Sequence, residues 1–438
     1  MSMTLIYSNR VVFGFTVICQ TGNNSSGVRD DISPDYYLLN TLNVAWMFTS
    51  TAIGMCLGPL PFYIFKNHNT RALIFVYGIV SSMSSLAYPL ADHLGFWPAF
   101  VCRFFAGFAQ ASQLQFTNDI VLRWAPQSES SFFFSIMLST SQIGPLITMI
   151  LGGEMCSSSL FGWKATYYVL GTLTFILSTA LAYFYSDSVE DNKHLNENEK
   201  KYILSGKHEM KHKESVPYKK MFADTTIWIN IIMFVGYYLA MIVYQQYSPT
   251  IIRRVLDFSI REAGYFSAIP QLIAILIKVV GGRLLDCNFG VSQKVMLAVP
   301  LVFLETLSAI ALFLTGFVDD RVLSLVAMLV FASLHFFVPV ICSRTIQIRA
   351  AQHAHFALNF IVIIAGISQI VIPLGVQAAA PENSREQWSR IFYFLAITVV
   401  LTILMYMAFT RVAAAKWTKK AEYTIYRLSD PNNECAKN

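Results

Sequence analysis

The sequence predicts an all-α protein that crosses a membrane many times, and three observations support this. Of its 438 residues, 55% are hydrophobic and only 13% are charged, which is too few charged side chains to cover the surface of a water-soluble domain. Apolar runs of about 20 residues, the length needed to cross a hydrocarbon core, recur almost to the end of the chain. In addition, lysine and arginine gather in every second connection between these runs.

Eleven apolar runs are expected to form membrane-spanning helices. The longest polar stretch, 187–221, follows the fifth run, so that five runs precede it and six follow. This odd count is unexpected for a bundle built from two matched halves. The runs cover residues 41–65, 72–92, 95–118, 131–155, 164–186, 225–249, 264–285, 295–317, 322–344, 353–378 and 390–412.

The missing helix could lie at the front of the chain. Within residues 1–20 the only continuous apolar stretch runs from Val11 to Cys19, directly after Arg10, and at about 1.5 Å per residue it is too short to cross the core. Three interpretations remain open. The stretch is the outer part of a first helix whose beginning is absent, a signal peptide with a short apolar region, or a real, tilted helix that tolerates Arg10. We prefer the first.

Charge placement predicts that both termini and the 187–221 stretch lie in the cytoplasm. If the runs alternate from there, 21 of the 32 lysines and arginines fall on the cytoplasmic side and 8 on the outer side, as the positive-inside rule requires. Overlapping glycosylation motifs at Asn23 and Asn24 fall on the outer side, so we expect these residues to carry sugar. The net charge of +6 therefore reflects topology and anionic lipid, and no nucleic-acid partner is expected.

The seven cysteines are scattered, without a CxxC pair or a nearby histidine. They are interpreted as packing residues, not as a zinc site or a disulfide framework. The sequence also contains no nucleotide-binding loop and no cluster of histidine, cysteine and aspartate. We therefore expect no enzyme, no catalytic residue, no metal site and no cofactor.

Several motifs keep the order found in one family of transporters. Arg103 begins RFFAG and Arg123 begins RWAPQSE, while GRLLD ends at Asp286 and EQWSRIF begins at Glu386. Singly each is weak. Together, in order over residues 100–415, they resemble the anion:cation symporter family of the major facilitator superfamily, to which sialin, the vesicular glutamate transporters and the type I phosphate cotransporters belong.

The resemblance implies the major facilitator fold, with two six-helix halves in which the first helix is truncated or degenerate. The expected parts are an N-terminal half at 1–186, a cytoplasmic linker at 187–221, a C-terminal half at 222–415 and a cytoplasmic tail at 416–438. It further implies a secondary transporter, functional as a monomer in the lipid bilayer, that carries small organic anions by alternating access. An ion gradient or the membrane potential would drive it, in the plasma membrane or in a vesicular or lysosomal membrane, and the coupling ion stays open.

Two charged residues inside the predicted helices are the candidate substrate ligands. Arg103 lies in the outer third of its run, and its planar guanidinium suits a carboxylate; the alternative is an arginine that reaches the outer interface. Lys278 lies in the middle of its run, where a charge is costly. It either faces the cavity or forms a structural ion pair, with Glu305 or Glu154.

Four further positions are expected in a central cavity, where they would influence coupling. The resemblance implies that Gln110 replaces the family's glutamate, which excludes proton coupling through a carboxylate at this position. Asn118 follows two turns later. The seventh-helix arginine of the glutamate transporters falls on Tyr237, and the family's first-helix arginine falls near Val12. His335 could relay protons, because imidazole titrates near neutral pH, or could simply pack within its aromatic run.

Arg283 and Asp286 are expected to act in gating. In the superfamily this loop pins the cytoplasmic ends of neighbouring helices in one state and releases them in the other. The matching loop of the first half, at 62–71, contains no acid, so the gate looks one-sided. These departures leave a second hypothesis open, in which the chain is a transport-inactive relative that acts as a sensor or scaffold, or an incomplete gene product.

Overall fold

The computed structural model describes residues 1–22, 35–61, 70–111, 113–126, 130–189, 195–204, 217–286, 292–350, 353–415 and 417–418. Within these ranges the chain forms helices and turns, and no strand occurs there. Nine helices of the described ranges are long and apolar enough to cross a membrane. The predicted all-α membrane class is therefore confirmed.

The chain divides into two compact units. Unit 1 comprises Met1–Lys211, Gln245–Leu272 and Gln369–Glu382, and unit 2 comprises His212–Tyr244, Ile273–Ser368 and Asn383–Asn438. Two segments from the later part of the chain therefore pack with the N-terminal part. The division at 187–221 into two six-helix halves stays a prediction.

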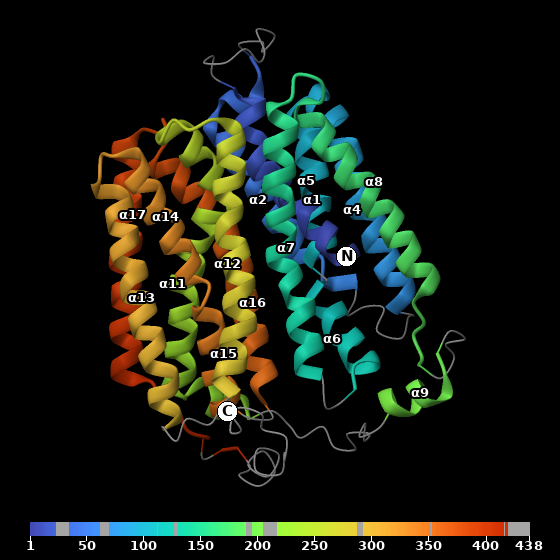
Figure 1. The fold of residues 1–438 in the computed structure, drawn as a ribbon, viewed down its shortest axis with the longest axis vertical. Helices are drawn as coiled ribbons and strands as arrows, with labels where there is room; N and C mark the ends of the chain where they lie inside the picture. Colours follow the sequence, from blue (N-terminus) through green and yellow to red (C-terminus); the bar gives the residue numbers. More distant parts are fainter. Residues whose placement is uncertain are drawn as a thin grey trace. The chain divides into compact units, whose positions relative to one another are not determined.

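Figure 1 shows the helices coloured by their order along the chain. They are divided between the two units as follows. Unit 1 contains α1 (Ser2–Gln20), the short 3₁₀ helix η1 (Tyr37–Leu39), α2 (Thr41–Leu57), α4 (Thr70–Leu94), α5 (Phe96–Ala111), α6 (Gln113–Trp124), α7 (Ser130–Ser157), α8 (Gly162–Phe184), α9 (Glu197–Leu204) and the π-helical turn η3 (Ile251–Val255). Unit 2 contains α10 (Tyr218–Phe222), α13 (Gln293–Phe317), α14 (Arg321–His335), α15 (Val338–Ala350) and α17 (Arg385–Phe409). Both units share α11 (Thr225–Thr250), α12 (Ile260–Asp286) and α16 (Ala354–Ala379).

Where the structure describes them, the eleven apolar runs coincide with helices, and the run at 322–344 is interrupted by a turn. The run at 95–118 corresponds to α5 followed by α6, and the run at 322–344 corresponds to α14 followed by α15. In the second case α14 ends at His335 and α15 begins at Val338. This places a turn in the middle of a predicted membrane span.

The first helix is longer than its apolar stretch indicated. Instead of nine residues it comprises nineteen, Ser2–Gln20, and it meets the length and hydropathy expected of a membrane span. At about 1.5 Å per residue, nineteen residues extend about 28 Å, close to the thickness of a hydrocarbon core. It packs against α4, α5, α7 and α8 and lies between them in Figure 1. The structure thus contains a first helix that tolerates Arg10, and whether its beginning is absent from the chain stays a prediction.

Polar residues lower the hydropathy of this segment, so the sequence did not indicate a membrane helix of full length. Ser2 lies 2.8 Å from the Ser178 hydroxyl, and the Asn9 amide donates to Ser81 and Thr174, both at 2.9 Å. Because these side chains are buried against other helices instead of lipid, they need protein partners and not an apolar surface. A helix surrounded by protein in this way does not require the continuous apolar composition of a lipid-facing span.

Close backbone contact between α2 and α5 depends on glycine. A Cβ atom on Gly107 would collide with the backbone carbonyl of Thr51, and a Cβ on Gly54 would collide with the carbonyl of Phe104. Small residues at such positions let two membrane helices approach closely, so that dispersion contacts form along their length. The glycine of the RFFAG motif therefore has a packing reason in this chain.

A disulfide joins the ends of α1 and α7. Cys19 and Cys156 are bonded across 137 residues of sequence, with their Cα atoms 6.1 Å apart. The interpretation of all seven cysteines as packing residues is wrong for these two. The error arose because spacing along the chain does not reveal which helix ends meet in space.

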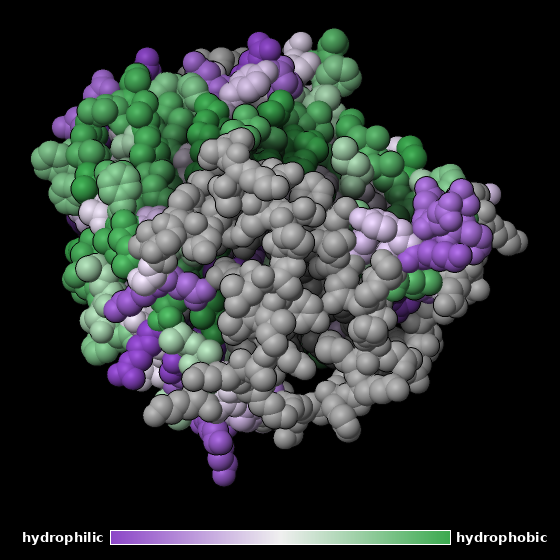
Figure 2. Space-filling view, turned by 60° about the horizontal axis from the view of Figure 1, so that its bottom comes forward, coloured by the Kyte–Doolittle hydropathy of each residue, from purple (hydrophilic) through white to green (hydrophobic). Residues whose placement is uncertain are grey.

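The outer surface of the helices is strongly apolar. Large hydrophobic side chains such as Trp97, Phe303 and Phe394 are more than half exposed. In Figure 2 hydrophobic residues cover wide areas of the described surface, and hydrophilic residues gather in separate groups towards the margins of the view. Exposed apolar surface of this extent requires a nonaqueous surrounding, as a lipid bilayer provides.

The contact between α2 and α5 makes a testable prediction. Gly107→Ala should lower the apparent melting temperature of the detergent-solubilised protein, because overpacking costs about 1–3 kcal/mol. Gly375→Ala is the matched control, since a Cβ there meets nothing within 4 Å and alanine favours a helix over glycine by about 0.5–1 kcal/mol. Equal melting temperatures for the two variants would contradict the packing role of Gly107.

Candidate functional site

Arg103 is buried in unit 1 and binds the backbone of α1. Its side chain extends from α5 and is 2% exposed. One guanidinium nitrogen, Nη1, donates to the carbonyl of Asn9 at 3.1 Å, and Nη2 donates to the carbonyl of Arg10. The guanidinium also lies over the ring of Phe13, 5.3 Å from its centroid. The arginine therefore faces the interior of the unit, and the interpretation that it reaches the outer interface does not hold.

Arg10 is a second buried guanidinium next to Arg103. It is 8% exposed, lies 5.0 Å from the ring centroid of Tyr7, and donates from Nη1 to the Gln110 side-chain oxygen at 3.2 Å. Sequence reasoning treated Arg10 as an obstacle to a first helix and did not propose it as a ligand. The polar residues that precede Arg10 were the signal that could have identified it as a ligand, because they indicate a helix face turned towards protein and not towards lipid.

Gln110 links Arg10 to a chain of amides. Its side-chain nitrogen donates to the Gln113 side-chain oxygen at 3.1 Å, and Gln113 donates to the Thr140 hydroxyl. The predicted central position of Gln110 stays a prediction. A carboxylate here would form an ion pair with Arg10, whereas the glutamine supplies a neutral acceptor. The charge of the arginine is therefore left uncompensated.

A small cavity lies beside the two arginines. It measures about 20 Å³, room for roughly one water molecule. All the lining residues belong to unit 1: Arg10, Val11, Gly14, Phe48, Thr51, Arg103, Gln245, Gln246 and Gln369. The three glutamines come from the later segments of the chain and were not proposed from the sequence. In this conformation the cavity is too small for an organic molecule.

Charge is the main chemical property of this cavity. In the part of the chain that the structure describes, neither Arg10 nor Arg103 pairs with a carboxylate, and their hydrogen bonds go to carbonyl and amide oxygens. Two positive charges buried without a counter-ion are unfavourable. Guanidinium groups bind carboxylate and phosphate oxygens through paired hydrogen bonds, so the arrangement is suited to an anion.

A second buried polar cluster lies in unit 2. His335 Nδ1 lies 2.8 Å from Glu305 Oε2, and the two side chains are only 2% and 1% exposed. The ring of Tyr237 stacks on His335 with centroids 5.2 Å apart. The structure thus brings together two of the predicted coupling positions, His335 and Tyr237, with a glutamate that had been suggested as a partner of Lys278.

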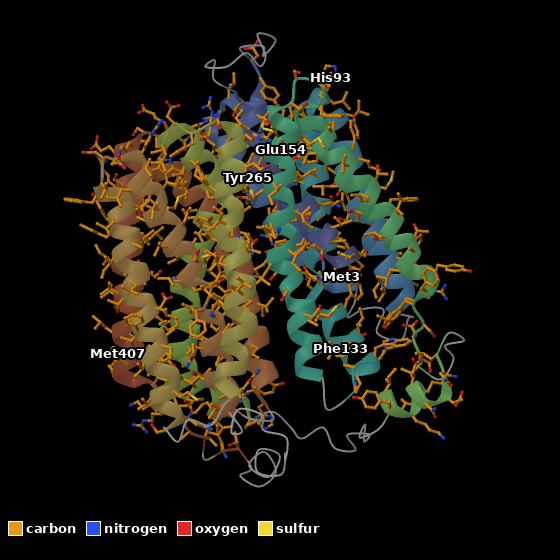
Figure 3. All side chains as sticks on the ribbon, in the orientation of Figure 1. Met3, His93, Phe133, Glu154, Tyr265 and Met407 are labelled. Atoms are coloured by element: carbon orange, nitrogen blue, oxygen red, sulfur yellow. A yellow bond between two sulfur atoms is a disulfide. The ribbon has the colours of Figure 1, made fainter. Side chains whose placement is uncertain are left out.

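Lys278 has a partner in neither suggested glutamate. It lies half-buried in α12, while Glu305 binds His335. Glu154 instead accepts hydrogen bonds from Arg261 Nε at 2.8 Å and from the Tyr265 hydroxyl at 2.6 Å. Glu154 and Tyr265 lie close together in Figure 3. A role of Lys278 in binding stays a prediction.

The remaining predicted residues fall at or beyond the edges of the described part. Arg283 and Asp286 lie in the last turns of α12, and Asn118 lies in α6, but their side chains are outside the described part. Asn23 and Asn24 are outside it altogether. Among the described residues, no group of three histidine, cysteine, aspartate or glutamate side chains could hold a metal ion.

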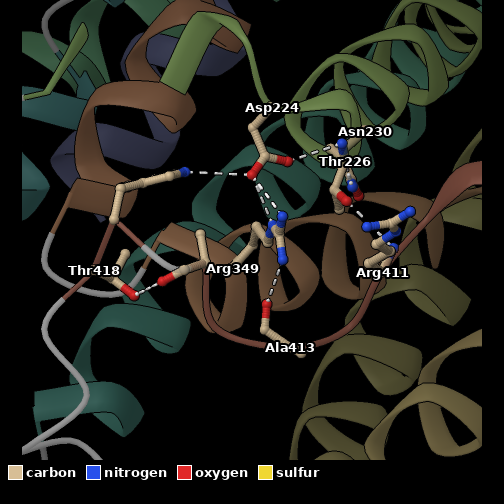
Figure 4. A network of polar contacts seen from close by, with 9 residues as sticks. Asp224, Thr226, Asn230, Arg349, Arg411, Ala413 and Thr418 are labelled. Atoms are coloured by element: carbon tan, nitrogen blue, oxygen red, sulfur yellow. Dashed lines mark hydrogen bonds and ion pairs between the residues drawn. The ribbon is translucent and has the colours of Figure 1, made fainter. Parts of the chain in front are cut away.

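An ion-pair network at one end of unit 2 ties three segments together (Figure 4). Asp224 accepts from Arg349 at 2.7 and 2.9 Å and from the Thr226 backbone at 2.9 Å. Arg349 also donates to the carbonyl of Ala413 at 3.1 Å. The network borders a hollow of about 530 Å³ that Lys220, Lys294 and Arg411 also line. Such basic groups are expected at the cytoplasmic ends of membrane helices.

Comparison with known proteins agrees with the fold and the motifs. The family model described as Major Facilitator Superfamily matches residues 32–373. Sodium-dependent phosphate transport protein 1 of Oryctolagus cuniculus is 24% identical over 96% of this chain and 93% of its own length. A probable small intestine urate exporter of Mus musculus is 25% identical over 86% of this chain and 78% of its own length.

A solved structure has the same fold. The crystal structure of a D-xylose-proton symporter matches 94% of this chain and 98% of its own, with a TM-score of 0.66 and 16% sequence identity. At this identity the likeness concerns the fold alone. It supports the same arrangement of helices and carries no information on the substrate of this chain.

The network around Asp224 makes a second prediction. Asp224→Asn should lower the apparent melting temperature, because Arg349 is then left partly uncompensated at a site where Asp224 is 4% exposed, at a cost of about 2 kcal/mol or more. Glu386→Gln is the control, since it breaks the exposed pair with Arg390, and exposed pairs contribute little. If the two variants melted alike, the network would have no stabilising role.

Proposed function

This chain belongs to the Major Facilitator Superfamily and to its anion:cation symporter family, and from this premise we propose that it is a secondary transporter of small organic anions. The observation that carries the proposal is the pair of buried guanidinium groups without a carboxylate, Arg10 and Arg103. A charge retained inside a membrane protein is costly, and its usual reason is function. An anion that binds both arginines would supply the missing negative charge.

The lining of the cavity fits an anion with an organic part. Arg10 and Arg103 provide donors for an anionic group, and Gln245, Gln246 and Gln369 provide amide groups that both donate and accept. Phe48 adds an apolar, aromatic surface. The names of the relatives, which refer to phosphate and urate, are consistent with an anion but do not identify this substrate.

Binding requires the cavity to open. An organic anion needs several times the 20 Å³ now present, and the Arg10 side chain must exchange its bond to Gln110 for a bond to the anion. Since the arginine bonds now go to neutral acceptors, the exchange replaces hydrogen bonds with one charged partner by hydrogen bonds in which both partners are charged. In the conformation described here the site is therefore closed to an organic anion.

One closing contact in unit 1 is suited to repeated opening. A Cβ built on Gly264 would meet the backbone of Gly153 and Met149, so that α7 and α12 touch through backbone. Beside them, the ion pair between Arg261 and Glu154 is largely exposed, at 61% and 37%, and exposed ion pairs are easily broken. We propose that this contact opens during alternating access, and that Arg283 and Asp286 act at the other end.

The disulfide supports the proposed orientation. The charge asymmetry places the end of the apolar stretch Val11–Cys19 and the end of the fourth apolar run, 131–155, outside, and Cys19 and Cys156 lie at these two ends. Disulfides persist in oxidising compartments and not in the cytosol. We therefore propose that both termini are cytoplasmic and that Asn23 and Asn24 face the glycosylating side, in the plasma membrane or in a vesicular or lysosomal membrane.

The other elements of the proposal follow from the family. The similar proteins are named as transporters, so we propose no enzymatic activity and no cofactor, with the carrier working as a monomer in the bilayer and an ion gradient or voltage driving it. A transport-inactive scaffold would not need two uncompensated buried arginines. That reading is therefore the weaker alternative.

Removal of either guanidinium tests the proposal. In proteoliposomes, Arg10→Gln and Arg103→Gln should each reduce counterflow of labelled organic anions at least tenfold, because a hydrogen bond to a charged group contributes about 1.5–3 kcal/mol. Arg390→Gln is the control, since Arg390 is 71% exposed. All variants are first compared by thermal unfolding. Unchanged counterflow in folded Arg10→Gln and Arg103→Gln protein would remove both residues from the site.

A further inference from the structure

The buried pair of His335 and Glu305 lies at a break in a membrane span. The predicted run at 322–344 is interrupted after His335, where the Phe337 amide bonds back to the carbonyl of Leu334 at 3.0 Å and α15 begins at Val338. The following residue, Pro339, fits the first turn of a helix, since the missing N–H is not needed there. Broken helices at membrane depth are the usual location of ion sites in transporters.

The pair is enclosed but has unused hydrogen-bonding capacity. While His335 Nδ1 and Glu305 Oε2 are 2.8 Å apart, the other imidazole nitrogen, Nε2, and the other carboxylate oxygen, Oε1, have no hydrogen-bond partner among the described residues. The Ser308 hydroxyl, one turn from Glu305 on the same face of α13, is also buried and without a partner there. Buried polar atoms are normally satisfied, so these indicate a site for an additional proton.

Among the described residues, aromatic rings and ordinarily neutral groups surround the pair. Tyr237 of α11 and Phe331 of α14 cover the imidazole ring, each with centroids 5.2 Å away. The titratable groups nearby are Tyr237, Cys342 of α15, on which the charge of Glu305 acts, and, beyond Cys342, Tyr406 of α17. All three are ordinarily neutral. No lysine or arginine of the described chain pairs with Glu305.

The charge of the pair depends on one proton. With a neutral imidazole that donates from Nδ1 and an ionised carboxylate, the pair has a net charge of −1, which is unfavourable in an enclosed apolar site. A proton on Nε2 makes the pair an imidazolium and a carboxylate with no net charge. The carbonyl end of α14 also favours a cation. Loss of this proton would leave an uncompensated charge in the enclosed pair, so we expect its release to require water at the site.

We propose that the pair of His335 and Glu305 is the proton-binding site that couples anion transport to a proton gradient, in place of the carboxylate that Gln110 lacks. The proposal rests on the proposed transport function. One proton from the solution on one side binds at Nε2, travels with the conformational change, and leaves from Nε2 to the solution on the other side. The hydrogen bond between Nδ1 and Oε2 stays in place, which positions the ring throughout.

The test separates exchange from gradient-driven uptake in proteoliposomes. Counterflow at equal pH needs no net proton movement, whereas accumulation against a gradient does. In Glu305→Gln and His335→Gln, counterflow should stay within about twofold of the parent. Uptake driven by an inward proton gradient should fall at least tenfold in both variants. His93→Gln, an exposed histidine at the end of α4, should keep both activities. The double variant Glu305→Gln/His335→Gln replaces both partners together, which is better tolerated than the loss of one, and should behave as the single variants do.

The possible results are distinct. Proton-driven accumulation in the variants equal to that of His93→Gln would overturn the coupling role while leaving transport intact. Accumulation in the parent that follows a sodium gradient and ignores a proton gradient would overturn it too. Absence of counterflow in the parent would overturn the proposed transport function, and the coupling role with it.

Discussion

The guanidinium of Arg103 bonded to the carbonyls of Asn9 and Arg10 is the interaction on which most of unit 1 depends. It holds α5 against α1, and the same stretch of α1 provides Arg10 and the Asn9 amide that reaches α4 and α8. Because lipid offers no hydrogen bonds, polar residues of this kind must find partners inside the protein. The first helix is therefore both the structural centre of the unit and one wall of the proposed anion site.

Each unit contains buried charged groups whose charge a transported ligand would reduce. In unit 1 the arginines need an anion. In unit 2 the proposed proton on His335 would neutralise its pair with Glu305. A charge that only a transported ligand neutralises is unfavourable in an empty, enclosed site, so an empty site has a reason to stay open to water and a loaded site can close. This gives a physical basis for coupling an anion to a proton without a carboxylate at Gln110.

Much of the fold could be predicted from the sequence, because length and hydropathy decide which segments can cross a membrane. The exception was α1, whose residues Ser2, Ser8 and Asn9 lower the hydropathy while facing other helices. For the same reason, Arg10 was interpreted as an obstacle to a membrane helix and not as a ligand. The break after His335 had a signal in Pro339, since proline is favoured in the first turn of a helix, but the signal was not used.

Contacts between distant residues could not be predicted. Glu305 and His335 are thirty residues apart, and the sequence equally allowed Glu305 to pair with Lys278. Cys19 and Cys156 are separated by 137 residues, so no local spacing indicates their bond. The three glutamines of the anion cavity come from segments that pack with unit 1 only in the folded chain. In each case the deciding information is which helix faces meet.

The central claim is that the uncompensated charge of Arg10 and Arg103 binds the anion, and adding a carboxylate beside Arg10 tests it most directly. Binding of organic anions to purified Gln110→Glu protein would be measured by calorimetry at neutral pH, beside the parent. The account predicts an affinity at least tenfold weaker, together with a higher melting temperature of the unliganded protein, because the new carboxylate neutralises Arg10. An affinity equal to that of the parent would contradict the account, since the anion would then not depend on that charge.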